Sequence, residues 1–187
     1  MMSAMETERP TGEKKSLRKA VRERLSSVPT DERKRRSAAI CDALKSHIAV
    51  CGARVVALFA PLPDEPDISP LIDNPGTARV VLLPRVEGDT MQFYCYDGNN
   101  LSAGYFGVSE PQGVEPVAPD EIDVMVVPGV VFTKDGARMG RGKGFYDKYL
   151  SLDGFRALKI GVCFAEQVVD ELPLEPHDVL MDSVVIM

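Results

Sequence analysis

Hydrophobic residues recur with helical spacing along the first fifty positions of the chain. Leu17, Val21 and Leu25 stand at i, i+4 and i+8, which predicts a helix over residues 13–27. Pro29 interrupts this pattern, and Thr30 is expected to cap a second helix over residues 31–49. The apolar stripe of the second helix consists of Ile40, Ala43, Leu44 and Ile48.

From residue 54 onward the helical pattern gives way to short apolar runs. Continuous runs at 55–59, 80–83, 124–127 and 158–164 predict strands that are covered on both faces, and 184–187 predicts a last strand. Residues 91–96 alternate, as an edge strand does. Short helices are expected through 71–72 and over 145–152. Residues 97–121, rich in Gly and Pro, form an excursion from the core.

Strands that alternate with helices predict one α/β domain over residues 1–187. We expect a mostly parallel sheet flanked by helices, with residues 1–10 frayed at the start of the chain. Ligands bind such sheets beyond the carboxyl ends of the strands. These ends are expected at residues 60–65, at Pro84-Arg85, in the loop 128–144 and at Ala165-Glu166.

Charge is unevenly distributed over the 187 residues. The net charge of −6 argues against general binding of nucleic acid. Residues 9–36 nevertheless hold eleven Lys or Arg and four Asp or Glu, so the remainder of the chain is strongly acidic. Within that remainder, cations gather at Arg138, Arg141, Lys143 and Lys148. A local cationic patch in an acidic domain indicates a discrete anionic ligand instead of a long polyanion.

The cysteines and the apolar runs indicate a cytoplasmic protein. Cys41, Cys51, Cys95 and Cys163 show neither metal-site nor redox-motif spacing, so we expect buried free thiols. No apolar run reaches the roughly 18 residues of a membrane span. The first ten residues contain no apolar stretch typical of a secretory signal.

The most distinctive segment follows the apolar run at 124–127. Beyond Pro128-Gly129, glycine takes every second position from 140 to 144, with Arg138, Arg141 and Lys143 beside these glycines. Alternating glycines let backbone N–H groups approach a ligand closely, and neighbouring cations suit a polyphosphate. Asp147, just after this loop, suits the Mg²⁺ that accompanies a polyphosphate. A mobile surface loop is the alternative interpretation.

This loop differs from two known phosphate-binding motifs. A Walker A loop has glycine where this chain has Ala137, and a hydroxyl residue where it has Gly144. The spacing of the three glycines also differs from the G-x-G-x-x-G fingerprint of dinucleotide-binding folds. The loop is therefore expected to bind phosphates in an arrangement of its own.

Few residues are suited to nucleophilic or histidine chemistry. The chain has two histidines, His47 on a predicted helix and His177 in a polar segment, and it contains no G-x-S-x-G motif. A serine hydrolase is therefore not expected. The acids best placed for function are Glu65, Asp147, Asp178 and Asp182, although each alone is more often a solvated or helix-capping acid.

In their order along the chain, the motifs resemble those of the 5-formyltetrahydrofolate cyclo-ligases, also called methenyltetrahydrofolate synthetases. The signature part consists of Pro128-Gly129, Phe132, Gly136, Arg138, Gly140, Gly142, Gly144 and Phe145-Tyr146-Asp147. Weaker matches are Lys14 with Arg18, Pro63-Asp64-Glu65, Pro84-Arg85, Glu110-Pro111, Pro173, Asp178 and Asp182. Two positions depart from the family: Thr133 stands where an acid is common, and Phe145 where tyrosine is common.

The resemblance implies a NagB/RpiA/CoA-transferase-like fold and an enzyme of one-carbon metabolism. Its reaction would convert 5-formyltetrahydrofolate and ATP to 5,10-methenyltetrahydrofolate, ADP and phosphate, through phosphorylation of the formyl oxygen. Mg²⁺ would accompany ATP. We expect a monomer that acts on these small molecules, with neither nucleic acid nor membrane as partner. A regulatory module that binds nucleotide or folate without turnover is the alternative.

The same resemblance assigns the site residues. ATP would bind Lys14, Arg18, Arg138, Met139, Gly140, Arg141, Gly142, Lys143, Gly144, Phe145 and Tyr146. The folate would contact Ala60, Glu65, Arg141, Gly142, Lys143, Gly144 and Phe145. Asp147 and Asp178 would hold Mg²⁺, and Lys143 and Arg141 would act on the transferring phosphoryl group. Arg22, on the same helical stripe as Lys14 and Arg18, is interpreted as part of a solvated face.

Overall fold

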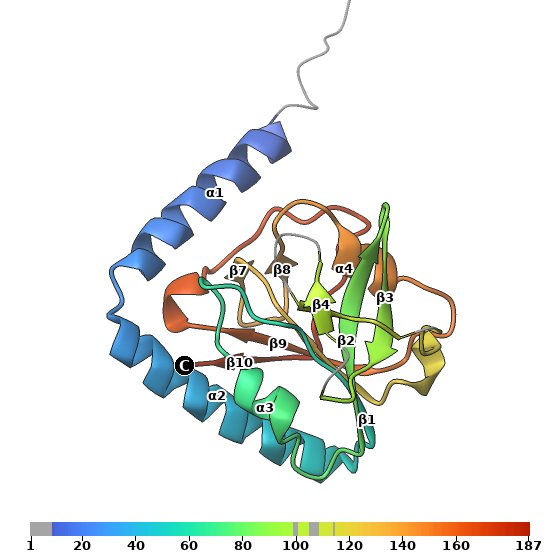
Figure 1. Ribbon diagram of the computed structural model, residues 1–187. Coiled ribbons are helices and arrows are strands. Elements are labelled where there is room, and N and C mark those ends of the chain that lie inside the picture. Colours follow the sequence, from blue (N-terminus) through green and yellow to red (C-terminus); the bar gives the residue numbers. More distant parts are fainter. Residues whose placement is uncertain (1–8, 99–100, 105–108, 114) are drawn as a thin grey trace, which may run out of the picture.

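The centre of the protein is a six-stranded sheet with the strand order β10-β9-β6-β1-β2-β3 (Figure 1). The computed structural model describes residues 9–98, 101–104, 109–113 and 115–187. The six strands are β1 (Val55–Ala57), β2 (Val80–Glu87), β3 (Thr90–Cys95), β6 (Val124–Val127), β9 (Leu158–Cys163) and β10 (Ser183–Ile186). All neighbours pair in parallel except β2 and β3. The mostly parallel sheet and the edge strand at 91–96 are therefore confirmed.

Alternate side chains of these strands enter two separate apolar layers. In β6, Val124 and Val126 pack with α2 (Thr30–Cys51) and α3 (Ser69–Asp73). Met125 and Val127 pack on the opposite face with Tyr149 of α4 (Phe145–Leu150). Both faces are buried, which explains why the strands are continuously apolar in sequence.

Helix α1 (Arg9–Ser26) lies against a small hairpin that leads into the glycine loop (Figure 1). The hairpin consists of β7 (Val131–Phe132) and β8 (Arg138–Met139). Val21 of α1 is fully buried and packs with Val131 and Met139 of the hairpin. This contact brings the basic stripe of α1 close to the loop, although more than a hundred residues separate them in sequence.

The remaining elements are short. A second hairpin, β4 (Leu101–Ala103) with β5 (Ser109–Pro111), lies in the expected excursion at 97–121. Single 3-10 turns occur at Pro119–Glu121 and Ala165–Gln167. In the part of the chain that the structure describes, no helix combines the length and the apolar character that a membrane crossing requires.

Four local expectations are corrected by the structure. Thr30 is the first residue of α2, and Pro29 stands at the capping position without a side-chain bond. β2 does not end at Pro84-Arg85 but runs to Glu87, because β3 pairs with it along that length. Cys41 and Cys163 are buried as predicted, whereas Cys51 and Cys95 are exposed. Residues 9–10 are helical, and the expected fraying of residues 1–8 lies outside the described residues.

Candidate active site

A cavity of about 390 Å³ lies beyond the carboxyl ends of β1 and β6, where parallel sheets bind ligands. Its walls come from α1, from the turn after β1, from β2 and β3, from the glycine loop and from the segment 172–178. All fifteen residues predicted to bind ATP, folate or metal line this one cavity. Two other candidates do not: His47 lies on α2, and Asp182 pairs with Lys159 at 2.9 Å.

The glycine loop owes its shape to two different requirements. Gly142 and Gly144 have φ of 99° and 69°, a conformation that other residues rarely adopt. At Gly140, a Cβ atom would lie 3.0 Å from Nη1 of Arg138, so glycine leaves room for that guanidinium. Helix α4 begins at Phe145 and ends at Leu150, two residues before the predicted end. A helix this short contributes little dipole.

Arg138 and Asp147 form a shielded ion pair in the wall of the cavity. Nη2 of Arg138 lies 2.8 Å from Oδ1 of Asp147, and the side chains are only 2% and 14% exposed. Oδ1 also accepts a hydrogen bond from Val179 N at 3.3 Å, next to Asp178. The structure therefore brings the two predicted metal acids to one wall. No side-chain hydrogen bond caps α4, so Asp147 does not act as the cap of this helix.

Lys14 connects α1 to the segment that carries Asp178. Its Nζ lies 2.5 Å from Oε2 of Glu175 and 3.2 Å from Oδ2 of Asp178. Burial works against the charge of Lys14, but the hydrogen bonds to these two carboxylates raise its pKa. Asp178 is only 13% exposed, so it is not a solvated acid.

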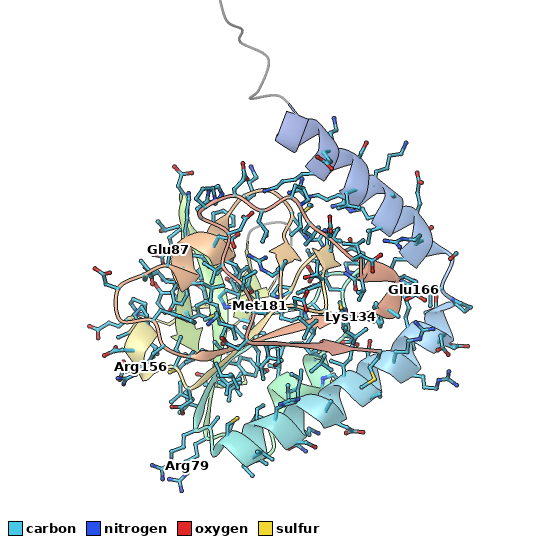
Figure 2. The ribbon with its side chains drawn as sticks, turned by 180° about the vertical axis from the view of Figure 1, so that it is seen from behind. Arg79, Glu87, Lys134, Arg156, Glu166 and Met181 are labelled. Atoms are coloured by element: carbon cyan, nitrogen blue, oxygen red, sulfur yellow. The ribbon has the colours of Figure 1, made fainter. Side chains whose placement is uncertain are left out.

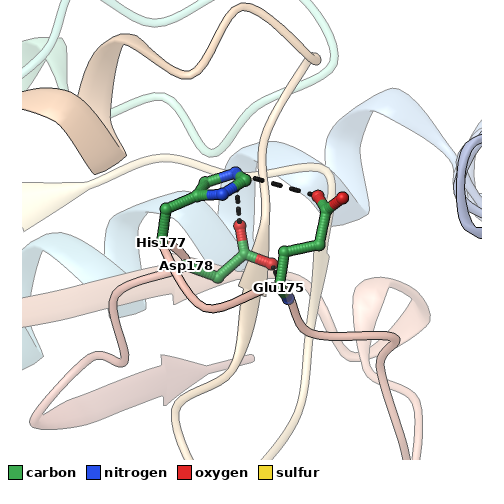
Figure 3. A group of neighbouring side chains, drawn as sticks. All are labelled: Glu175, His177 and Asp178. Atoms are coloured by element: carbon green, nitrogen blue, oxygen red, sulfur yellow. Dashed lines mark hydrogen bonds and ion pairs between the residues drawn. The ribbon is translucent and has the colours of Figure 1, made fainter.

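Figure 3 shows Glu175, His177 and Asp178 grouped at this point, with ligand atoms within 4.8 Å of one another. The ammonium of Lys14 already offsets the two carboxylates of this group, so the grouping alone does not indicate a metal ion. Glu175 was not among the predicted site residues. Its position three residues before Asp178 in a polar segment was the one available signal.

Two arginines hold the glycine loop to its surroundings. Arg18 Nε donates to Gly140 O at 2.8 Å, which fixes the loop to α1. Arg141 donates to Asp64 and, through Nη2 at 2.9 Å, to Oε1 of Glu65. Burial disfavours the charge of Arg141, but the bond to Asp64 and the charge of Glu65 raise its pKa.

Glu65 is held on both carboxylate oxygens. Oε2 accepts from Leu62 N at 3.0 Å, within the turn after β1, and Oε1 accepts from Arg141. The side chain is only 7% exposed. The acid predicted to contact the folate is thus held at the cavity wall, where it pairs with Arg141 of the glycine loop.

Comparisons with known proteins agree on one family. The family model described as 5-formyltetrahydrofolate cyclo-ligase family matches residues 10–187. A 5-formyltetrahydrofolate cyclo-ligase from Mycolicibacterium smegmatis is 35% identical, over 91% of this chain and 92% of the relative. The enzyme of that name from Mus musculus is 25% identical over the same shares.

Solved structures of similar proteins show the same fold. The 5,10-methenyltetrahydrofolate synthetase from Aquifex aeolicus superimposes with a TM-score of 0.81 at 35% identity, covering 92% of this chain and 89% of the other. The synthetase from Mycoplasma pneumoniae gives a TM-score of 0.72 at 24% identity, over 91% and 96%. At that identity, the second likeness concerns the fold alone.

Proposed function

The chain belongs to the 5-formyltetrahydrofolate cyclo-ligase family, and we propose that its cavity converts 5-formyltetrahydrofolate and ATP to 5,10-methenyltetrahydrofolate, ADP and phosphate. One observation supports placing the reaction here. A single cavity is lined by two cations of α1, by the glycine loop and by three acids, all from distant parts of the chain: Lys14, Arg18, residues 140–144, Glu65, Asp147 and Asp178.

The reaction explains why the cavity needs neither a serine nor a histidine nucleophile. The formyl oxygen attacks the γ-phosphorus of ATP, the bond to the bridging oxygen breaks, and ADP leaves. The neighbouring amine of the folate then attacks the activated carbon. This amine loses its proton, the carbon–oxygen bond breaks, and phosphate departs as the ring closes. Because the substrate supplies its own nucleophile, the protein needs only to position the two ligands and stabilise phosphate charge.

Individual residues take the following roles in this proposal. Lys14 and Arg18 of α1 and the amides of residues 140–144 bind the phosphates of ATP. Lys143 and Arg141 stabilise the charge on the transferring phosphoryl group. Glu65 and Ala60, in the turn after β1, contact the pterin end of the folate, since a carboxylate can accept paired hydrogen bonds from an amino-pyrimidine edge.

Asp147 and Asp178 are suited to hold Mg²⁺. Carboxylate oxygens are the ligands that this ion prefers, and one or two of them suffice when phosphates and waters complete its shell. Among the described residues, both hydrogen bonds to the carboxylate of Asp147 fall on Oδ1, so Oδ2 is the oxygen that would bind the ion. When bound, the ion would offset charge on the phosphates. The ammonium of Lys14 lies 3.2 Å from Oδ2 of Asp178 and offsets the charge of that carboxylate.

Three further predictions belong to this proposal. The classification of the sheet as NagB/RpiA/CoA-transferase-like is supported by the parallel order of β10-β9-β6-β1-β2. A single cyclo-ligase domain over 1–187 is supported by the family match, which starts at residue 10. A monomer in the cytoplasm is the expected state.

The test is a direct assay of the purified protein. With 5-formyltetrahydrofolate, ATP and Mg²⁺, the absorbance of the methenyl product should rise, with one ADP formed per ring closed. A folded protein that binds both ligands without forming the chromophore would instead fit a binding module. The family and its relatives do not favour that alternative.

A further inference from the structure

Closing the ring releases a proton from the amine of the folate, so the proposed reaction needs a group that accepts it. A carboxylate within hydrogen-bond reach of the amine is suited to this role. Five carboxylates line the cavity: Glu65, Glu110, Asp147, Glu175 and Asp178.

Four of these acids are bound to cations. The ion pairs join Glu65 to Arg141, Asp147 to Arg138, and both Glu175 and Asp178 to Lys14. A neighbouring cation stabilises the ionised form of a carboxylate, which makes that carboxylate a weaker proton acceptor. These four acids are therefore better suited to hold charge in place than to take up a proton.

Glu110 lies in a different part of the cavity. It belongs to β5, and the wall beside it is formed by apolar residues of β2 and β3. Val86 N of β2 donates to Oε1 of Glu110 at 3.2 Å, and Met91 of β3 is the partner of Val86 in the sheet. This wall suits the aromatic ring of the folate. The amine that closes the ring is attached directly to that aromatic ring, so a ring on this wall brings the amine to Glu110.

The surroundings of Glu110 hold it in a defined position. The residue is only 8% exposed. Arg85 Nη1 donates to Pro111 O at 3.3 Å and to Gly113 O at 2.9 Å, which ties the chain after Glu110 to β2. A Cβ atom at position 104 would overlap the carboxyl group of Glu110, so Gly104 leaves the room that this side chain occupies. A glutamate that is nearly enclosed and still lines a cavity is placed for contact with a ligand.

We propose that Glu110 is the proton acceptor of ring closure. The proposal rests on the proposed function, because it concerns the second step of that reaction. As the amine nitrogen attacks the activated carbon, its N–H bond breaks and an O–H bond forms on the carboxylate of Glu110. The electron pair of the N–H bond stays on nitrogen, while the carbon–oxygen bond breaks and phosphate departs with the pair of that bond. Glu110 returns the proton to solvent after the product leaves.

Glu110→Gln separates the two steps of the reaction. Glutamine keeps the shape of the side chain, and its amide oxygen can still accept from Val86 N, so the variant should fold. After rapid mixing, chemical quenching measures ADP and absorbance measures the methenyl product. In the wild-type protein both should appear together. In Glu110→Gln, ring closure should be about 100-fold slower or more, and ADP should exceed the methenyl product in the first turnover.

Glu110→Ala provides a second, independent measurement. This substitution removes the carboxylate and leaves space at the wall for a small acid. Added formate should then speed ring closure in proportion to its concentration, because formate takes the proton in place of Glu110. If Glu110 had only a structural role, formate would not restore the rate.

The matched control is Glu115→Gln. Glu115 is exposed, follows Glu110 by five positions and is not among the residues that line the cavity. Glu115→Gln should keep the wild-type time course for ADP and for the methenyl product, with or without formate.

Three results would overturn the role of Glu110. They are wild-type rates of both steps in Glu110→Gln, an equal slowing of ADP and methenyl formation in that variant, and a Glu110→Ala protein that formate does not accelerate. Failure of the proposed function gives a different result, since the wild-type protein itself would then form no methenyl product from 5-formyltetrahydrofolate, ATP and Mg²⁺.

Discussion

The guanidinium of Arg138 holds the carboxylate of Asp147 in a fixed direction, with 2.8 Å between Nη2 and Oδ1. Arg138 Nη1 also donates to Pro128 O at 3.3 Å, and its guanidinium carbon lies 5.6 Å from the ring centre of Tyr146. These contacts join the end of β6, the hairpin strand β8 and the start of α4. Arg138 is thus bound to Asp147 and to the backbone, and its predicted contact with ATP remains a proposal.

We expect Arg138→Met to destabilise the fold. Removing one member of a shielded pair leaves an uncompensated charge, and about 2–3 kcal/mol should be lost, because Asp147 keeps some contact with solvent. Urea unfolding measures the loss. In a double-mutant cycle with Asp147→Asn, the double variant should be about 1–2 kcal/mol more stable than the sum of the single losses predicts. Strictly additive losses would show that the pair does not couple the two residues.

Lys143→Ala should impair turnover far more than stability. The side chain is exposed in the glycine loop, so its removal leaves no cavity. Losing a cation directed at the transferring phosphoryl group should cost about 3 kcal/mol in the barrier, or about 100-fold in kcat/KM for ATP. The matched control is Lys134→Ala. Lys134, which is labelled in Figure 2, is an exposed residue of the preceding hairpin and is not among the residues that line the cavity. Wild-type kcat/KM in folded Lys143→Ala would contradict the assignment.

Glu65→Gln should weaken folate binding and leave ATP binding close to wild type. Glutamine keeps the shape of the side chain but replaces one acceptor oxygen with a donor, so paired acceptance from the pterin is lost. Titration calorimetry with each ligand measures the two affinities. Asp64→Asn provides the control, because Asp64 shares the contact with Arg141. If both variants weakened folate binding equally, the effect would come from the loss of the contact with Arg141 and not from recognition of the folate by Glu65.

Much of the fold follows from local patterns in the sequence. The apolar runs at 124–127 and 158–164 predict β6 and the span of β9 closely, because both strands are buried on both faces and admit few polar residues. The start of β2 was predicted correctly, but its end was placed too early, since proline at position 84 usually ends a strand. Here β3 continues the pairing beyond it.

The sequence predicted most of the residues that gather at the cavity, but neither Glu175 nor the pairings between side chains. Alternating glycines and cations identify the loop, because its backbone conformation restricts which residues it accepts. The bond between Lys14 and Glu175 joins residues 161 positions apart, and Arg141 reaches Asp64 across 77 positions. Such partners depend on how α1 and the turn after β1 pack on the finished sheet. A single sequence carries no local signal for them.

The role of Asp147 in metal binding can be separated from its structural role. Asp147→Asn should raise the Mg²⁺ concentration needed for half-maximal rate about tenfold or more, because an amide oxygen is a weaker ligand than a carboxylate. Initial rates measured against Mg²⁺ at fixed ATP give this midpoint, and Asp178→Asn should shift it in the same direction.

Asp182→Asn is the matched control, since Asp182 pairs with Lys159 and does not line the cavity. A folded Asp147→Asn protein with a lower kcat and an unchanged Mg²⁺ midpoint would limit Asp147 to its pair with Arg138. A shift in the midpoint with Asp147→Asn and Asp178→Asn, but not with Asp182→Asn, would place the ion between the two acids.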